Sequence, residues 1–344
     1  MRRLLPAIAL LLIAPVVAEF LLGDFSVRQL GFIAFFLPQY GCGALLIREL
    51  ARRRKRGWPT MLLLALAYAL IEEGLTTQSL FNPNYANERL LDYGYIEALG
   101  TSLNWTVFVL TLHVVWSIGS SIALAEGLSG GRWDLPWLGT RGLIITAIGY
   151  VLGCGLTIGS TYVTYPYTAS PSQLATVSIL AAATVYAAFR AFRGHSAPRR
   201  GSVPSPWLVG ATSFLLCSAF HLLNDHGHGH ELPAALTLAG MLTLEGVAIV
   251  LFAIWSRRDG WPATSELTQN TRVEWTPQHP LAAAGGAIVT YGWVGLTRMI
   301  GNGTTALGVP TSVTDNIGQA ILLASIVALI AIGARRLARE RQAA

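Results

Sequence analysis

Charged side chains are scarce in this sequence. Only 12% of the 344 residues are Asp, Glu, Lys or Arg, whereas 53% are hydrophobic and the mean hydropathy is +0.50. A soluble globular protein is excluded, because its surface requires roughly twice as much charge, about 25% of all residues. The cysteines are also few: Cys42, Cys154 and Cys217 lie in apolar runs without metal or redox spacing, which indicates small buried residues.

Long polar stretches are lacking too. The longest loops, about 80–102 and 256–279, are near 23 residues, too short to form a core of their own. We therefore expect a single integral membrane domain over residues 1–344. Within it we place a possible active core at 59–255 and an additional two-helix C-terminal segment at 256–344.

Apolar runs of the length that spans a bilayer, about 20 residues at about 1.5 Å each, dominate the chain. They predict an all-α polytopic transmembrane bundle of about ten helices, in which the first, second, sixth, ninth and tenth are scaffold. The ten runs cover residues 4–22, 29–48, 59–79, 103–125, 142–163, 173–191, 206–224, 233–255, 280–299 and 314–334.

The distribution of cations predicts the orientation, because cytoplasmic loops retain Lys and Arg. With both termini in the cytoplasm, 21 of the 24 cationic residues face that side, and Arg28, Arg89 and Arg298 face outward. We therefore expect a multi-pass protein of the cell membrane. The net charge of +6 follows from this topology, so we expect no nucleic-acid partner; cations 52–56 are expected to meet anionic membrane lipids.

Ionisable residues inside the predicted helices are the main functional signal, because each costs at least a few kcal/mol in lipid. Glu72 and Glu73 are adjacent in the third helix, about 100° apart, so both cannot point equally well at one ligand. His113 lies near the middle of the fourth helix. Glu245 in the eighth needs protonation or a partner such as His113 or Arg298.

The seventh helix ends with His221 and Asp225 four residues apart, a spacing that can share a metal or form an orienting pair. A histidine tract follows in a short outer loop, and we interpret it as a weak metal site: His226, His228 and His230. At 1.5 Å per residue, Glu72, Glu73, His113 and His221 all fall in the middle to outer half of the bilayer. We therefore expect these four side chains to converge.

The order Glu-Glu, His, then His-x-x-x-Asp resembles the intramembrane family of CAAX prenyl endopeptidases and bacteriocin-processing proteases. Glu72 and Glu73 match the acids of its first motif, His113 the histidine of its second, and His221 with Asp225 its third. Two positions depart from the pattern. Thr77 stands where the first motif has Arg, and Val109, next to Phe108, where the second has Phe.

The resemblance implies hydrolysis of a membrane-associated peptide or lipidated substrate within the bilayer. Glu72 or Glu73 would be the general base, and Asp225 would complete the site. His113 and His221 would stabilise the oxyanion or, with Glu73, hold a divalent metal such as zinc.

Two other functions fit the same residues. A proton- or cation-coupled transporter could use the acids of the third and eighth helices as its ion pathway. A lipid-acting hydrolase of the ceramidase type would depend more on the histidine tract. Both alternatives remain open at the level of sequence.

Overall fold

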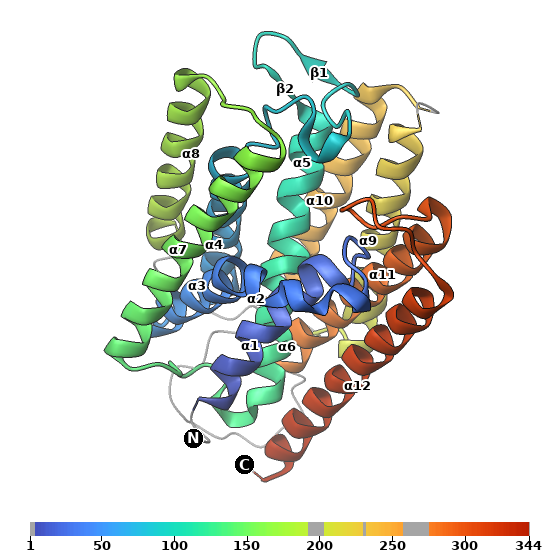
Figure 1. Cartoon of the computed structure of the whole chain (residues 1–344). Coiled ribbons are helices and arrows are strands. Elements are labelled where there is room, and N and C mark those ends of the chain that lie inside the picture. The colour runs from blue at the N-terminus through green and yellow to red at the C-terminus, as the bar shows by residue number, and fades with distance from the viewer. Residues whose placement is uncertain (1–3, 192–202, 230–231, 257–274, 344) are drawn as a thin grey trace.

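A computed structural model describes residues 4–191, 203–229, 232–256 and 275–343. In this part of the chain the fold is a bundle of helices with one short antiparallel hairpin, formed by β1 and β2 at the end opposite to the first residues of α1 and the last residues of α12 (Figure 1). The expected all-α membrane fold is confirmed. The elements are α1 (Leu5–Pro15), η1 (Val16–Phe20), η2 (Val27–Phe32), α2 (Ile33–Phe36), η3 (Leu37–Gly41), α3 (Cys42–Arg53), α4 (Trp58–Ile71), η4 (Glu72–Thr76), η5 (Tyr85–Asn87), β1 (Tyr95–Ile96), β2 (Thr101–Ser102), α5 (Leu103–Leu112), η6 (His113–Ser120), α6 (Ser121–Ser129), η7 (Gly130–Arg132), α7 (Thr140–Thr164), α8 (Pro171–Arg190), α9 (Pro206–His228), α10 (Ala234–Ser256), α11 (Gln278–Asn302) and α12 (Val313–Ala343).

Every predicted span falls on a helical run. Among the described residues, eight runs are long and apolar enough to cross a membrane, and Leu5–Phe20 is a shorter apolar one. Helix α11 lies on the remaining predicted span, 280–299. Both ends of the chain lie at one end of the bundle, as an even number of crossings requires (Figure 1).

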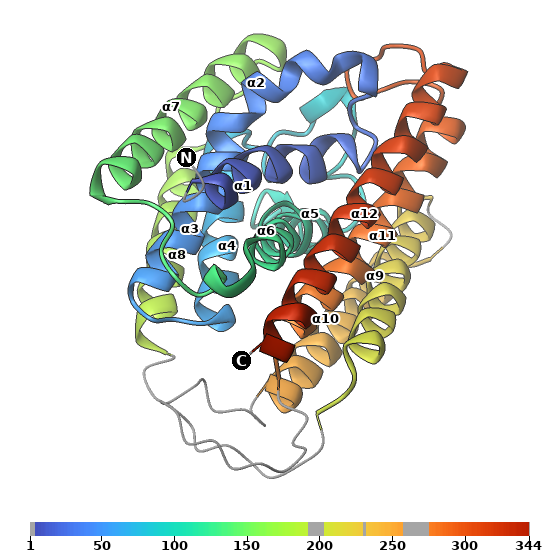
Figure 2. The same cartoon turned by 90° about the horizontal axis from the view of Figure 1, so that it is seen from below.

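The helical run α5–η6–α6 occupies the middle of the molecule. Viewed from below, it lies between α3, α4, α7 and α8 on one side and α9 to α12 on the other (Figure 2). It is also the most buried of the membrane spans, whereas α7 and α10 expose most of their apolar side chains. Six of the eight residues of η6, His113 among them, are therefore buried inside the bundle.

Four helices contain a π-helical segment, in which hydrogen bonds run from residue i to i+5 and the helix widens locally. These segments are η1, η3, η4 and η6. In η6 the absence of a side chain at Gly119 makes the wide turn possible, because a Cβ there would lie 2.6 Å from the carbonyl oxygen of Val114. Such segments recur at functional sites, where they redirect side chains.

The C-terminal helices are joined to the N-terminal part by buried contacts. Gln319 of α12 donates a hydrogen bond of 2.6 Å to the carbonyl oxygen of Leu21. Asp315 forms an ion pair with Arg28, in which Oδ2 of Asp315 lies 2.6 Å from Nη2 of Arg28. The division into a core at 59–255 and an added segment at 256–344 stays a prediction.

A second set of contacts connects α3 with α6 at the predicted cytoplasmic end. Arg52 pairs with Glu126 at 2.6 Å, and Arg48 pairs with both Glu126 at 3.1 Å and Glu49 at 2.7 Å. All four side chains are buried. The expectation that cations 52–56 all face lipid headgroups is therefore wrong for Arg52, because its charge is neutralised inside the protein.

Candidate functional site

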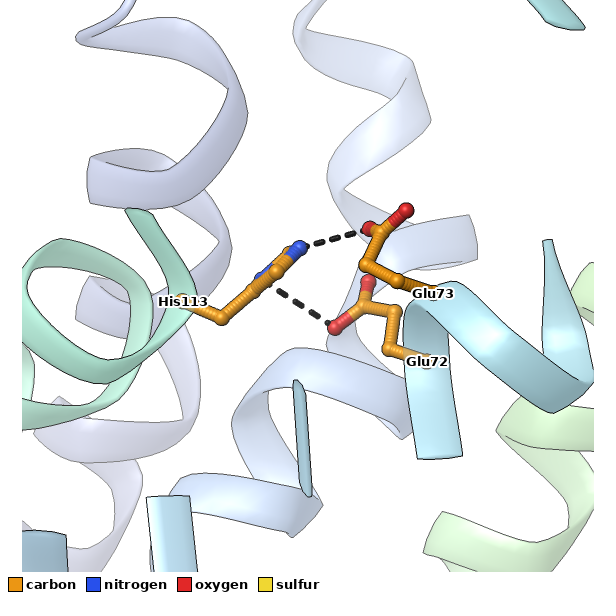
Figure 3. Close-up of side chains that lie close together, drawn as sticks. All are labelled: Glu72, Glu73 and His113. Atoms are coloured by element: carbon orange, nitrogen blue, oxygen red, sulfur yellow. Dashed lines mark hydrogen bonds and ion pairs between the residues drawn. The ribbon is translucent and has the colours of Figure 1, made fainter. Parts of the chain in front are cut away.

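Glu72, Glu73 and His113 form a compact buried group at the centre of the bundle. The Nε2 atom of His113 lies 2.7 Å from Oε1 of Glu73, and its Nδ1 atom lies 3.3 Å from Oε2 of Glu72 (Figure 3). All three residues are at most 6% exposed. The imidazole thus bridges two carboxylates, one at each ring nitrogen.

The two adjacent glutamates reach the same residue because they contact different atoms of it. Both carboxylates begin the π-helical segment η4, and His113 begins η6. Each acid faces a different nitrogen of the imidazole ring (Figure 3). The helix positions and the ring geometry therefore define one site with two unequal acids.

Glu73 is held firmly by neighbouring hydroxyl groups. Its Oε2 atom accepts hydrogen bonds from Thr77, at 3.1 Å, and from Ser79. Trp105 in turn donates its indole N–H to Ser79 at 3.2 Å. The chain can fold back in this way because Gln78 adopts a left-handed conformation with φ of 54°. Glu73 therefore has partners on both oxygens and an orientation fixed by packing.

Glu72 is less satisfied. Its Oε2 atom is buried and accepts no hydrogen bond of good geometry, although the hydroxyls of Tyr68 and Tyr40 lie close enough to interact with the carboxylate. The rings of Tyr68 and Tyr40 pack against the imidazole of His113, with centroids 6.1 and 6.0 Å from it. Buried polar atoms without a good hydrogen bond are costly and rare, so their presence next to a histidine singles out Glu72 as the less constrained of the two acids.

Two residues of this site are absent from the set predicted from sequence. Glu19 on η1 lies close enough to interact with the Tyr40 hydroxyl and with the charges of Glu72 and His113. Tyr40 lies on the π-helical segment η3. The first and second helices are therefore not plain scaffold. Applying the depth criterion to the acid in the first apolar run would have identified Glu19.

The outer loop that follows η4 lies close to the site. Burial, followed by the charges of Glu73, Glu19 and Glu72, raises the pKa of the Tyr85 phenol well above its usual range. Phe81 of the same loop packs in a buried cluster with Val109, four residues before His113. The loop thus covers the outer side of the site.

His221 is not part of this group. The ligand atoms that lie within 4.8 Å of one another in the described chain come from Glu72, Glu73 and His113. His221 is fully buried among aromatic rings, and neither of its ring nitrogens has a hydrogen-bond partner. The expected convergence of four residues is therefore correct for three. The rings around His221 belong to Phe108, Trp116, Phe220 and Tyr291.

The residues beyond His221 differ from expectation as well. Helix α9 continues to His228 rather than ending near residue 224, so His226 is helical, and Asp225 is exposed. His230 and the side chain of His228 lie outside the described residues, and a metal site there stays a prediction. Glu245 accepts a hydrogen bond from Thr111.

The partners expected for Glu245 are engaged elsewhere. His113 contacts Glu72 and Glu73, and Arg298 lies 3.7 Å from Asp24. The expectation that either would pair with Glu245 is therefore wrong. Glu245 is a half-buried carboxyl separate from the central group, which makes it a useful control for experiments on the site.

A divalent metal fits this arrangement poorly. Zinc requires donor atoms at about 2.0–2.2 Å that converge on one point. The ligand atoms lie within 4.8 Å of one another, which would permit this. However, Nε2 of His113 is hydrogen bonded to Glu73, and its Nδ1 faces Glu72. The imidazole would have to rotate to bind an ion together with both acids. The donor set suits proton transfer better than metal binding.

The sequence matches the model of an uncharacterized membrane protein family over residues 8–195, more than half of the chain. The chain belongs to this family. No curated protein and no solved structure gives a significant match. The matched range contains Glu19, Tyr40, both central glutamates and His113, and it ends before α9 begins. The family region thus includes the whole central site and excludes His221.

Proposed function

We propose that this membrane protein is a hydrolase whose reaction takes place at Glu72, Glu73 and His113 inside the bilayer. The observation that carries the proposal is the bridged arrangement of one imidazole between two buried carboxylates, of which one is fixed and the other is unsatisfied. A catalytic site requires a base that can still accept a proton and a partner that orients this base. Glu72 supplies the first, and Glu73 with His113 supplies the second.

In this mechanism Glu72 accepts a proton from a water molecule, and the hydroxide oxygen bonds to the carbonyl carbon of the substrate. The Tyr68 hydroxyl, which lies beside Glu72, donates a hydrogen bond to the developing oxyanion. When the bond from the carbonyl carbon to the leaving nitrogen or oxygen breaks, that atom takes the proton back from Glu72. His113, held by Glu73, keeps the Glu72 carboxylate aligned throughout.

The resemblance to CAAX prenyl endopeptidases gives partial support. Glu72, Glu73 and His113, which match its first two motifs, are adjacent, whereas the matches to its third motif, His221 and Asp225, are not part of the group. Tyr68 would then replace the third motif as oxyanion donor. A peptide is the substrate class that this comparison favours.

Transport is the less favoured function, because it requires a polar path to both faces. In the described chain, the space between α3 and α6 on the predicted cytoplasmic side is occupied by the paired charges of Arg48, Glu49, Arg52 and Glu126. Beyond the site, Glu19 and Asp24 interact with each other and lie toward the predicted outer end of the first helical run. A blocked cytoplasmic side suits a hydrolase better than a transporter.

The test uses the purified full chain in lipid nanodiscs with an internally quenched peptide, a farnesylated peptide and a nitrophenyl ester. We expect hydrolysis of at least one probe, with one oxygen-18 atom incorporated from labelled water and no effect of EDTA. Glu72→Gln should lower the rate at least about 100-fold. Glu245→Gln, a matched intramembrane carboxyl outside the site, should stay within about twofold.

Failure to cleave any probe, or full activity of Glu72→Gln, would contradict the proposal. Proton movement measured with a pH-sensitive dye in sealed vesicles, abolished by Glu72→Gln, would favour transport instead. Inhibition by EDTA, reversed by zinc, would show that the metal predicted from sequence is required.

A further inference from the structure

An open cavity of about 590 Å³ lies on the outer face beside the loop that follows the site. Its walls include Phe81, Pro83, Tyr95, Tyr167 and Gln173, contributed by the loop after η4, the β hairpin, the α7–α8 connection and α8. Its volume is within the range of about 300–1,000 Å³ that is typical of ligand pockets.

The cavity is structurally connected to the catalytic group. Phe81 forms part of its wall and lies two residues after Ser79, whose hydroxyl donates to Glu73. The same phenylalanine packs in one buried cluster with Val109 of α5, the helix that leads into His113. Phe81 therefore links the cavity wall to the segment that holds Glu73.

The residues that line the cavity favour a ligand in which an apolar group lies next to a polar backbone. Phe81, Tyr95 and Tyr167 contribute aromatic rings, and the Gln173 amide donates a hydrogen bond of 3.4 Å to the carbonyl oxygen of Gly100, which also lines the cavity. Gly100 has a left-handed φ of 62°, and a Cβ there would lie 2.6 Å from Nε2 of Gln173. Gln173 and the β hairpin are thus joined at the cavity, beside the exposed ring of Tyr95.

The charges around the cavity are mainly negative. Residues 80–102 carry the acids Glu88, Asp92 and Glu97 but a single cation, Arg89, which pairs with Asp92. Glu88 and Glu97 are exposed, and the α7–α8 connection carries no charge. This potential attracts a cationic ligand and repels the phosphate of a lipid headgroup.

We propose that this cavity binds an apolar or aromatic side chain of a basic, extended peptide and positions the peptide for the central site. This substrate class rests on the proposed hydrolase function. The occupant is a peptide rather than a phospholipid, because aromatic walls and unpaired acids complement an apolar side chain flanked by lysine or arginine.

The binding test is independent of catalysis because it uses the Glu72→Gln chain in nanodiscs made from zwitterionic lipid. The probe is a fluorescein-labelled pentapeptide of alternating lysine and tryptophan, and the comparison probe has glutamate in place of lysine. Fluorescence anisotropy at low ionic strength should show binding of the basic probe at least about tenfold tighter, since surface charge effects are strongest there.

Tyr95→Ala should weaken binding of the basic probe about tenfold, as expected for loss of an aromatic contact. The double change Glu88→Gln and Glu97→Gln should reduce the preference for the basic probe severalfold. Tyr162→Ala, which removes an exposed tyrosine of α7 outside the cavity, is the matched control and should leave binding unchanged.

Equal affinity for both probes would overturn the proposal, and so would unchanged binding by Tyr95→Ala. Binding that instead follows the content of anionic lipid in the nanodisc would indicate a lipid-binding surface. If wild-type protein binds the basic probe as expected but cleaves no peptide, the hydrolase function fails while the binding site stands.

Discussion

Two buried groups of ionisable residues lie at different depths in this bundle, and they differ in how completely their members are paired. At the inner end, Arg48 and Arg52 balance Glu49 and Glu126, and the backbone N–H groups of residues 137 and 138 donate to Glu49 as well. At the centre, two glutamates face one histidine, with a further acid, Glu19, close by.

This difference distinguishes charged groups that stabilise the fold from charged groups that can take part in a reaction. A buried ion pair that is fully hydrogen bonded holds helices in place and has no capacity left for a ligand. The central group has excess carboxylate, and buried oxygens of Glu72 and Tyr68 have no hydrogen bond of good geometry. Because such atoms reduce stability, their retention indicates that they serve another purpose.

The largest effect expected concerns stability at the inner end. Glu126→Ala removes the carboxylate that pairs with buried Arg52 and leaves Arg48 with Glu49 alone, so it should destabilise the protein by about 3–5 kcal/mol. Unfolding in mixed detergent micelles measures this, and Arg335→Ala on an exposed position is the control. Glu72→Gln should change stability by less than about 1 kcal/mol. Comparable losses in both variants would mean that the central group is structural too.

A smaller effect is expected on activity from Ser79→Ala. This change removes one hydrogen bond to Glu73 and the acceptor of the Trp105 indole, so His113 loses part of its support. We expect kcat to fall about 10- to 100-fold with KM nearly unchanged, because a positioning residue acts on the reacting groups rather than on binding. Ser121→Ala, another fully buried serine, is the control. A rise in KM alone would place Ser79 in substrate binding.

Hydropathy and depth along the chain were sufficient to predict the spans and most of the centre. Apolar length determined the helices, and the cost of burying charge singled out Glu72, Glu73 and His113. Depth gives only the level of a residue in the membrane, however, and not the side of the helix on which it lies. His221 shares the level of His113 but faces an aromatic cluster instead of the glutamates.

The π-helical segments explain why further residues escaped prediction. A single wide turn shifts the face of every later residue in the helix by roughly 100°, and no sequence pattern reveals it. Glu19 and Tyr40 both lie on such turns, in helices that by composition resemble scaffold. Gln39 illustrates the same point, since it donates a hydrogen bond of 3.3 Å to Thr76 of η4.

The smallest effect is expected at His221. This residue has unpaired buried nitrogens like a functional group, but it lies outside the central site. His221→Phe replaces an imidazole with two unsatisfied nitrogens by a ring of similar shape inside the aromatic cluster. The gain from removing buried polar atoms should offset any overpacking, so the unfolding free energy should change by less than about 1.5 kcal/mol.

Activity of His221→Phe should stay within about threefold of wild type, whereas His113→Phe should lose at least about 100-fold, because only His113 contacts the carboxylates. Both variants are compared at equal folded fraction, judged by unfolding in the same micelles. A folded but inactive His221→Phe protein would show that His221 approaches the central group during the reaction. The unpaired ring nitrogens of His221 would then identify a side chain that moves. Both histidines would take part in the reaction, and they would differ only in the conformation that this structure shows.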